Sequence, residues 1–166
     1  MKKPFDEYTH HYDLWFDTKG REIYLHELWA LCGLIPGSRG IEVGVGTGRF
    51  AGFLNIKFGV DPSANSLKLA KGRIKNLVCG YAEDLPFKNG SFDFALVVVS
   101  ICFFDDILRA FSEIGRILKV GGKLILGFVP RNTCIGEFYV YKGLGGHRIA
   151  NSEGLLIRGD LGQSLR

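Results

Sequence analysis

The chain has 166 residues, of which 46% are hydrophobic, and a formal net charge of +4. This length suits one domain with a sizeable core and is too short for two ordinary domains. The 21 basic residues are scattered along the chain, so we expect no nucleic-acid partner. The longest apolar run, Phe94 to Phe104, is interrupted by Ser100 and is too short to span a bilayer, and the N-terminus carries no apolar signal region. We therefore expect a cytoplasmic protein with no membrane span.

The first 38 residues are expected to form a helical cap. Aromatic residues recur at spacings of three and four between Phe5 and Phe16, which indicates an amphipathic helix. A second helix, from about Glu22 to Cys32, would have one apolar side formed by Leu25, Leu28, Trp29 and Cys32. We expect the two helices to cover a sheet edge or the functional site.

Residues 39–130 alternate between strand and helix patterns and are expected to form the core of the domain. Strands are predicted at residues 41–45, 56–60, 77–81, 92–100 and 123–129. The run 92–100 is almost continuously apolar, as in strands buried on both faces, and is placed at the centre of the sheet. Helices are predicted from Arg49, from Asn65 and after Asp105 or Asp106, and Gly121-Gly122 is expected to end the last one. This alternation predicts an α/β three-layer sandwich with a mainly parallel sheet of about five strands.

Residues 131–166 are expected to form an irregular or truncated tail of the same single domain, 1–166. This segment is rich in glycine, and its longest strand signal is Leu155 to Ile157. If the sheet ends at the fifth strand, its edge favours pairing with another chain, so self-association is possible.

The four cysteines, Cys32, Cys79, Cys102 and Cys134, form no C-x-x-C pair. We therefore expect neither a metal site nor a disulfide scaffold, and we interpret the cysteines as small core residues. Cys102 follows a strand end, where chemistry remains an alternative to packing.

The most informative stretch is residues 41–48, Ile-Glu-Val-Gly-Val-Gly-Thr-Gly. A short β-branched strand leads into alternating glycines, which allow positive φ and close approach of a ligand to the backbone. A dinucleotide fingerprint needs its third glycine where this chain has Arg49, so the spacing disfavours NAD. An ordinary strand-to-helix turn remains an alternative reading of the same pattern.

The second predicted strand ends in Asp61, within Gly59-Val60-Asp61-Pro62-Ser63. An acidic side chain at this position can accept hydrogen bonds from both hydroxyls of a ribose that lies across the first loop. Alternatively, Asp61 or Ser63 caps the following helix, and the two roles can coexist.

With the elements in this order, the chain resembles a class I S-adenosylmethionine-dependent methyltransferase of the methyltransferase type 11 group, which has a Rossmann-like fold. The similarity covers roughly Tyr8 to Val129. The matching motifs are Glu42 to Phe50, Gly59 to Ser63, Gly80 to Phe87, Ser91 to Ala95, and Ile117 to Leu124, with Val120 where proline is usual.

The resemblance implies S-adenosylmethionine as cofactor and a set of contacts to it. Glu42 would bind the methionyl amino group, often through water, and Asp61, followed by Pro62, would hold the ribose hydroxyls. The backbone that follows the methionyl and ribose portions would be that of Gly44, Val45, Gly46, Thr47 and Gly48.

The resemblance also places residues around the adenine and the sulfonium. Tyr81 stands where the family commonly has Asp or Asn, so adenine recognition would fall to the Ala82 backbone and Glu83, with Tyr81 stacking or pointing away. Ser100 and Ile101 would lie near the sulfonium, although Ser100 is equally well explained as a hydroxyl bonded to backbone. Candidate bases lie on the N-terminal helix, His10, His11 and Tyr12, but exposed histidines are typical of solvated surface, and no catalytic residue is assigned.

The residues after the fourth strand bear on the methyl acceptor. Ser100-Ile101-Cys102-Phe103 lacks the Asn/Asp-Pro-Pro-Tyr run of enzymes that methylate planar amide or base nitrogens, which favours a small-molecule acceptor. Because relatives usually carry two further strands, the alternative is a cofactor-binding but catalytically incomplete fragment or partner subunit.

Overall fold

A computed structural model describes residues 4–128, with side chains from Thr9 onward. The expected tail, 131–166, lies outside the described residues. The helical cap consists of α1 (Pro4–Trp15) and α2 (Arg21–Cys32), close to the predicted bounds. In α2, Leu28 and Leu31 are buried, whereas Trp29 is 85% exposed, so the predicted apolar side of this helix was wrong in part.

Within residues 4–128, five parallel strands form one sheet with the order β3-β2-β1-β4-β5. Their bounds are β1 Gly40–Val43, β2 Phe58–Asp61, β3 Asn76–Cys79, β4 Phe92–Val98 and β5 Leu118–Gly127. The connecting helices are α3 (Arg49–Phe53), α4 (Ala64–Ala70), the short 3-10 helix η1 (Ile101–Phe103) and α5 (Ile107–Ile117). The predicted α/β sandwich is confirmed, although β1 and not β4 holds the centre of the described sheet.

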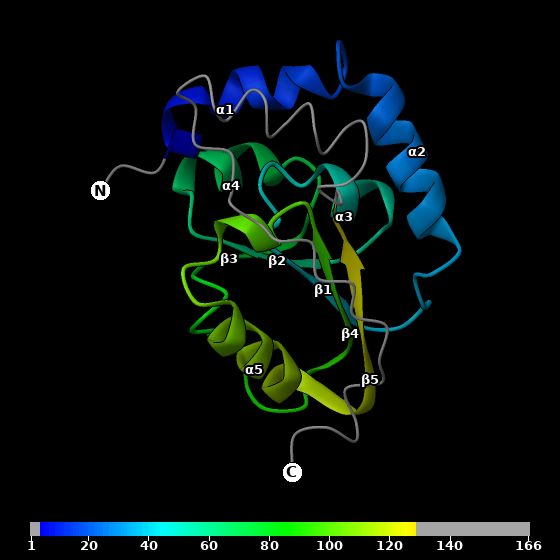
Figure 1. The fold of residues 1–166 in the computed structure, drawn as a ribbon, viewed down its shortest axis with the longest axis vertical. Helices are drawn as coiled ribbons and strands as arrows, with labels where there is room; N and C mark the ends of the chain where they lie inside the picture. The colour runs from blue at the N-terminus through cyan, green and yellow to red at the C-terminus, as the bar shows by residue number, and fades with distance from the viewer. Residues whose placement is uncertain (1–3, 129–166) are drawn as a thin grey trace.

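Strand β4 shows how the sheet is covered on both faces. Phe94, Leu96 and Val98 pack with buried side chains of α2 and α3, while Ala95 and Val97 pack with those of α5. This alternation follows from the two-residue period of a strand and explains why its sequence is continuously apolar. Figure 1 shows α5 on one side of the sheet, with α2, α3 and α4 away from it.

Strand β5 starts earlier than predicted. Helix α5 ends at Ile117 because the backbone of Leu118 turns extended, and Leu118 pairs with Phe92. Gly121 and Gly122 therefore lie inside β5 and do not end the helix as expected. A register shift between Phe92 and Phe94 accommodates the extra residues.

Two of the cysteines depart from the expectation of core packing. Cys32 and Cys79 are exposed, whereas Cys102 is half-buried. Cys134 lies outside the described residues. The packing interpretation was therefore wrong for Cys32 and Cys79.

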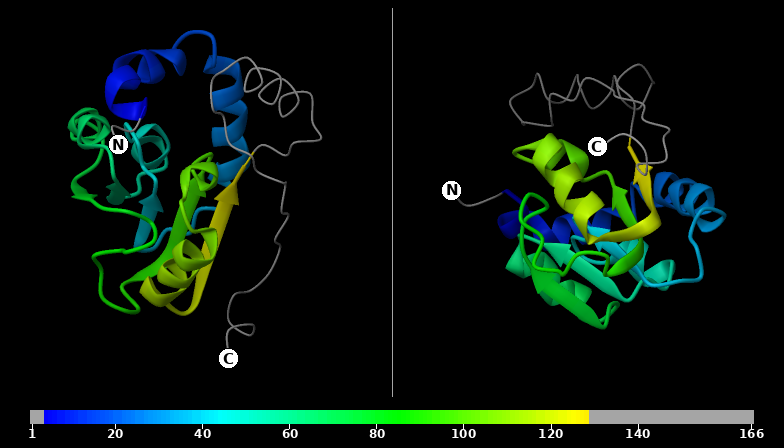
Figure 2. Two further views of the ribbon diagram at one scale, coloured as in Figure 1. Left: turned by 60° about the vertical axis from the view of Figure 1, so that its left-hand side comes forward. Right: turned by 90° about the horizontal axis from the view of Figure 1, so that it is seen from below.

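Helix α1 lies at the end of the sheet toward which the strand arrows point, as Figure 2 shows. This is the carboxyl end of the strands, where open α/β sheets bind their ligands. Within residues 4–128, no helix is long and apolar enough to cross a membrane.

Candidate functional site

The glycine loop between β1 and α3 is built on positive backbone φ angles. Gly44, Gly46 and Gly48 have φ of 77°, 52° and 80°. A Cβ on Gly44 would stand 2.5 Å from the Cβ of Ser100, whereas a Cβ on Gly46 would meet no atom within 4 Å. Gly44 therefore serves close packing between two loops, and Gly46 presents open backbone at the carboxyl end of the sheet.

Asp61, the last residue of β2, supports this loop from the neighbouring strand. Its Oδ2 accepts a hydrogen bond from the Gly46 N–H at 2.8 Å, and its Oδ1 accepts one from the Ser63 N–H at 2.8 Å. Helix α4 is capped by Ser63, whose hydroxyl accepts from the Ser66 N–H at 3.1 Å. Of the two capping candidates, Ser63 caps the helix and Asp61 serves the loop.

Glu42 lies in β1 beneath the loop and is 2% exposed. Its Oε2 accepts a hydrogen bond from the Ala51 N–H of α3 at 2.7 Å. Burial raises the pKa of Glu42 to about 8; the Ala51 hydrogen bond opposes this rise, and the charge of Asp61 adds to it. Burial therefore favours the protonated form of this carboxyl.

The end of β4 lies against the end of β1. The Ser100 hydroxyl, in a side chain that is 9% exposed, donates to the Val43 carbonyl oxygen at 3.2 Å, so the backbone-bonded reading of this residue is observed. Ile101, which begins η1, is half-buried. Val99 has φ of 49°, an outlier for a β-branched residue, at the point where the chain leaves the sheet. Backbone strain of this kind is typical of functional sites.

Three candidate residues, Tyr81, Ala82 and Glu83, lie in the segment after β3. Tyr81 is 49% exposed and Ala82 is 6% exposed. Glu83 accepts through Oε1 from the N–H groups of Asp105 and Asp106, at 2.7 and 3.3 Å. The carboxylate of Glu83 therefore fixes the loop that leads into α5.

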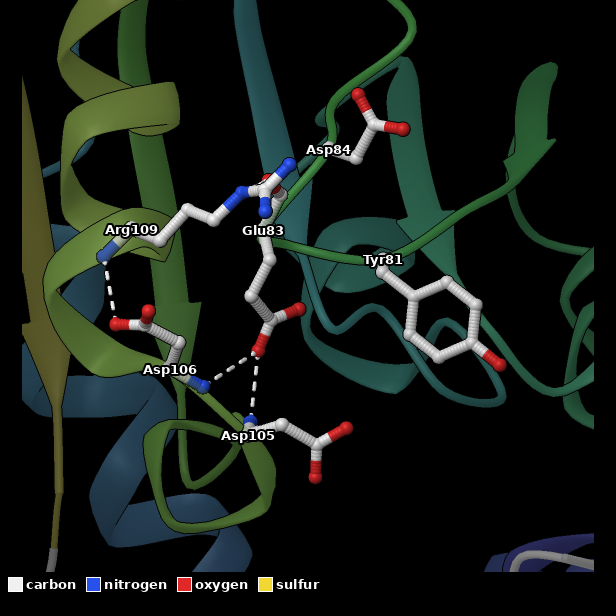
Figure 3. Close-up of a pocket in the computed structure, with 6 residues that line it drawn as sticks. All are labelled: Tyr81, Glu83, Asp84, Asp105, Asp106 and Arg109. Atoms are coloured by element: carbon white, nitrogen blue, oxygen red, sulfur yellow. Dashed lines mark hydrogen bonds between the residues drawn. The ribbon is translucent and has the colours of Figure 1, made fainter.

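A surface pocket of about 340 Å³ adjoins this segment. Its lining residues are Tyr81, Glu83, Asp84, Asp105, Asp106 and Arg109. In Figure 3 the ring of Tyr81 points away from the group formed by Glu83, Asp106 and Arg109. Arg109 completes that group, since its Nε donates to the Glu83 carbonyl oxygen at 2.9 Å.

Helix α1 brings its own candidates to the same end of the sheet. Tyr12 is 40% exposed, and its ring contacts the edge of Phe16, with centroids 5.1 Å apart. His10 and His11 are exposed.

The sequence patterns do not predict the ion-pair network that lies next to the glycine loop. Asp13 of α1 accepts hydrogen bonds from both Arg49 and Arg73 at 2.9 Å. In the sequence, Arg49 is informative only because it stands where a dinucleotide-binding fingerprint needs its third glycine. No pattern in the sequence could have paired it with Asp13, which is 36 positions away.

Comparison with known proteins now identifies the class. The family model described as "Methyltransferase domain", type 11, matches residues 41–126. A structure of an S-adenosylmethionine-dependent methyltransferase of Thermotoga maritima, described as a possible histamine N-methyltransferase, is 46% identical with a TM-score of 0.82, over 86% of this chain and 68% of that chain.

Three further proteins are similar to this chain in sequence over part of their length. An uncharacterised protein of Methanocaldococcus jannaschii is 44% identical over 83% of this chain and 67% of its own length. One of Mycobacterium tuberculosis is 38% identical over 81% of this chain, which spans only 48% of that relative. A demethylmenaquinone methyltransferase of Thermotoga maritima is 35% identical over 56% of this chain and 44% of its own length.

The parallel sheet, the glycine loop and the Thermotoga structure define a class I methyltransferase fold. The chain belongs to the methyltransferase type 11 family, as its motifs predicted, and the cofactor of this class is S-adenosylmethionine.

Proposed function

We propose that the chain transfers a methyl group from S-adenosylmethionine to a small-molecule acceptor. The observation that carries this proposal is the hydrogen bond from the Gly46 N–H to Asp61. It joins the open glycine backbone and the carboxylate that we propose for the ribose at the carboxyl ends of β1 and β2. Because a Cβ at Gly46 would occupy only open space, the loop suits a ligand that runs against its backbone.

The donor contacts follow from the positions of these residues. The backbone of residues 44–48 would follow the methionyl and ribose portions. Asp61 would accept from the ribose hydroxyls through its carboxylate oxygens. Glu42 would face the methionyl ammonium, whose charge favours the ionised carboxylate and offsets the effect of burial.

The adenine and the reacting centre would lie on either side of the loop after β4. Pro62, Tyr81 and Ala82 would border the adenine, while Glu83 shapes that border through Asp105 and Asp106. Ser100 and Ile101 would approach the sulfonium from the sheet, and Tyr12 from α1. A phenol ring packed on Phe16 brings an apolar surface to that side.

S-adenosylmethionine supplies an electrophilic methyl group on a sulfonium, so the protein needs no nucleophile of its own. The contribution of the chain is to align the acceptor with the methyl–sulfur bond and to exclude water. A base is required only when the acceptor must lose a proton, and we assign none.

Two named relatives support a small acceptor. The Thermotoga structure is described as a possible histamine N-methyltransferase, and another Thermotoga relative acts on demethylmenaquinone. Both names describe acceptors that are not macromolecules. Neither name points to a nucleic acid, in agreement with the scattered basic residues of this chain.

Calorimetric titration with S-adenosylmethionine, followed by turnover assays on histamine, other small amines and quinols, tests the proposal. We expect binding of the donor and methylation of at least one small acceptor. Binding without turnover on the whole panel would instead favour a cofactor-binding partner subunit. Tight binding of NADH in place of S-adenosylmethionine would overturn the donor assignment.

A further inference from the structure

Asp13, close to the end of α1, is shared by two arginines that are distant in sequence. Arg49 donates to its carboxylate through Nε and Nη2, and Arg73 donates through Nη1 and Nη2, with all four distances at 2.9 Å. Arg49 Nη2 also donates to the Asp13 backbone carbonyl at 2.8 Å. The side chains of Asp13 and Arg49 are only 15% and 13% exposed. Two bidentate pairs that share one carboxylate fix both its position and its orientation.

Both arginines are joined to the glycine loop. Arg49 is the first residue of α3 and follows Gly48 directly. Arg73 also donates through Nη1 to the Thr47 carbonyl oxygen at 2.8 Å. Asp13 therefore connects α1 with the middle and the end of the loop that carries Gly46.

Asp13 is ionised at neutral pH. Burial raises the pKa of this carboxyl, but hydrogen bonds from the side chains of Arg49, Arg73 and Thr47 together hold it well below its usual range. Without Asp13, two guanidinium groups would stand beside each other at the loop, where the more exposed Asp17 pairs with Arg49.

Helix α1 has a second, apolar attachment that does not depend on Asp13. Phe16, just beyond the helix, contacts the rings of Tyr24 and Phe50 at centroid distances of 5.1 and 6.1 Å. The Tyr24 hydroxyl donates to the Arg49 carbonyl oxygen at 3.0 Å. Loss of the Asp13 side chain would thus leave the helix in place. It would remove the bonds of α1 to Arg73 and weaken its attachment to Arg49, which keeps its bonds to the Asp13 carbonyl and to Asp17.

We propose that Asp13 is a positioning residue for the methyl donor: it binds Arg49 and Arg73 so that α1 and the glycine loop move and close on the donor as one unit. This inference rests on the proposed function, because the donor is assigned to that loop.

The first test compares donor binding in Asp13→Ala, Asp13→Glu and Asp17→Ala. Asp17 is the matched control, since it also pairs with Arg49, at 2.5 Å, but is 58% exposed. We expect Asp13→Ala to weaken S-adenosylmethionine binding by about tenfold, with faster dissociation, as suits the loss of charge-assisted hydrogen bonds. Asp13→Glu should recover part of this loss, and Asp17→Ala should remain close to the wild-type chain. Equal losses in Asp13→Ala and Asp17→Ala would overturn the inference.

The second test needs no ligand. Hydrogen exchange of the Asp13→Ala chain should be faster in residues 4–15 and 44–48 and unchanged in β4 and β5. If exchange is unchanged in α1 and the loop, or if it accelerates throughout the sheet, Asp13 does not position these two segments locally. Failure of the wild-type chain to bind S-adenosylmethionine would reject the proposed function instead, so the two failures are distinguishable.

Discussion

The carboxylate of Asp61 accepts a hydrogen bond from the Gly46 N–H, with 2.8 Å between Oδ2 and N. This contact ties the end of β2 to the loop that follows β1. The loop thereby orients the carboxylate that we propose as the ribose acceptor.

Replacement of Asp61 by alanine should weaken S-adenosylmethionine binding. The variant loses the proposed ribose contacts and the support of Gly46, and removal of such hydrogen bonds costs about 1–3 kcal/mol. Calorimetry at constant pH and salt measures the change in affinity.

Asp93→Ala is the matched control for that experiment. Asp93 also accepts a backbone hydrogen bond, from the Arg39 N–H at 2.9 Å, but it stands at the opposite end of the sheet. Its replacement should leave donor affinity unchanged. Wild-type affinity in Asp61→Ala would contradict the ribose assignment.

Gly46→Val should abolish donor binding because its side chain would fill the open backbone of the loop. The new residue also has to adopt a φ of 52°, at a cost of about 1–2 kcal/mol in stability. Gly90→Val carries the same type of strain, at a φ of 63°, but outside the loop. Thermal unfolding should show similar destabilisation of both variants, and a loss of binding in Gly90→Val would show that strain alone explains the effect.

The order of elements and the position of Asp61 near the glycine loop could be predicted from the sequence, but not the hydrogen bond between Asp61 and Gly46. Glycines, apolar runs and capping residues mark the elements locally, and the carboxyl ends of parallel neighbours β1 and β2 must meet at one edge. The start of β5 could not be predicted, because it depends on how Leu118 pairs with Phe92 across the sheet.

Side-chain partners that lie far apart in the sequence were also beyond prediction. Glu83 binds backbone 22 and 23 positions away, and Asp13 binds arginines 36 and 60 positions away. Such pairs depend on the packing of whole elements and leave no local pattern. The sequence therefore could not predict that the Glu83 carboxylate holds the loop before α5, and its expected role at the adenine stays a prediction.

Cys102 should react slowly with thiol reagents. Burial raises the pKa of its thiol to about 11, so almost no reactive thiolate is present at pH 8. Cys32 and Cys79 are exposed and should be modified first. Peptide mass spectrometry after brief iodoacetamide treatment measures the order, and early modification of Cys102 would favour chemistry over packing at this position.

Glu42 should make the stability of the ligand-free chain depend on pH. Its pKa rises from an ordinary 4.5 to about 8 in the fold, so between these values the folded chain holds a proton that the unfolded chain has lost. The contribution of neutral Glu42 is complete below 4.5 and is lost as the pH rises through about 8. Urea unfolding from pH 5 to 9 should show this decline, and Glu42→Gln should remove it. An identical decline in Glu42→Gln would assign the pH dependence to other groups.

Donor binding at pH 7 should release protons from Glu42. The methionyl ammonium proposed to face this carboxyl favours its ionised form, so the proton held by the ligand-free chain would leave on binding. Calorimetric titrations in two buffers with different ionisation enthalpies measure the number of protons released. Because Glu42→Gln keeps the shape of the side chain and has no carboxyl proton, it should show weaker binding and less buffer dependence. Equal buffer dependence in both proteins would place the methionyl ammonium away from Glu42.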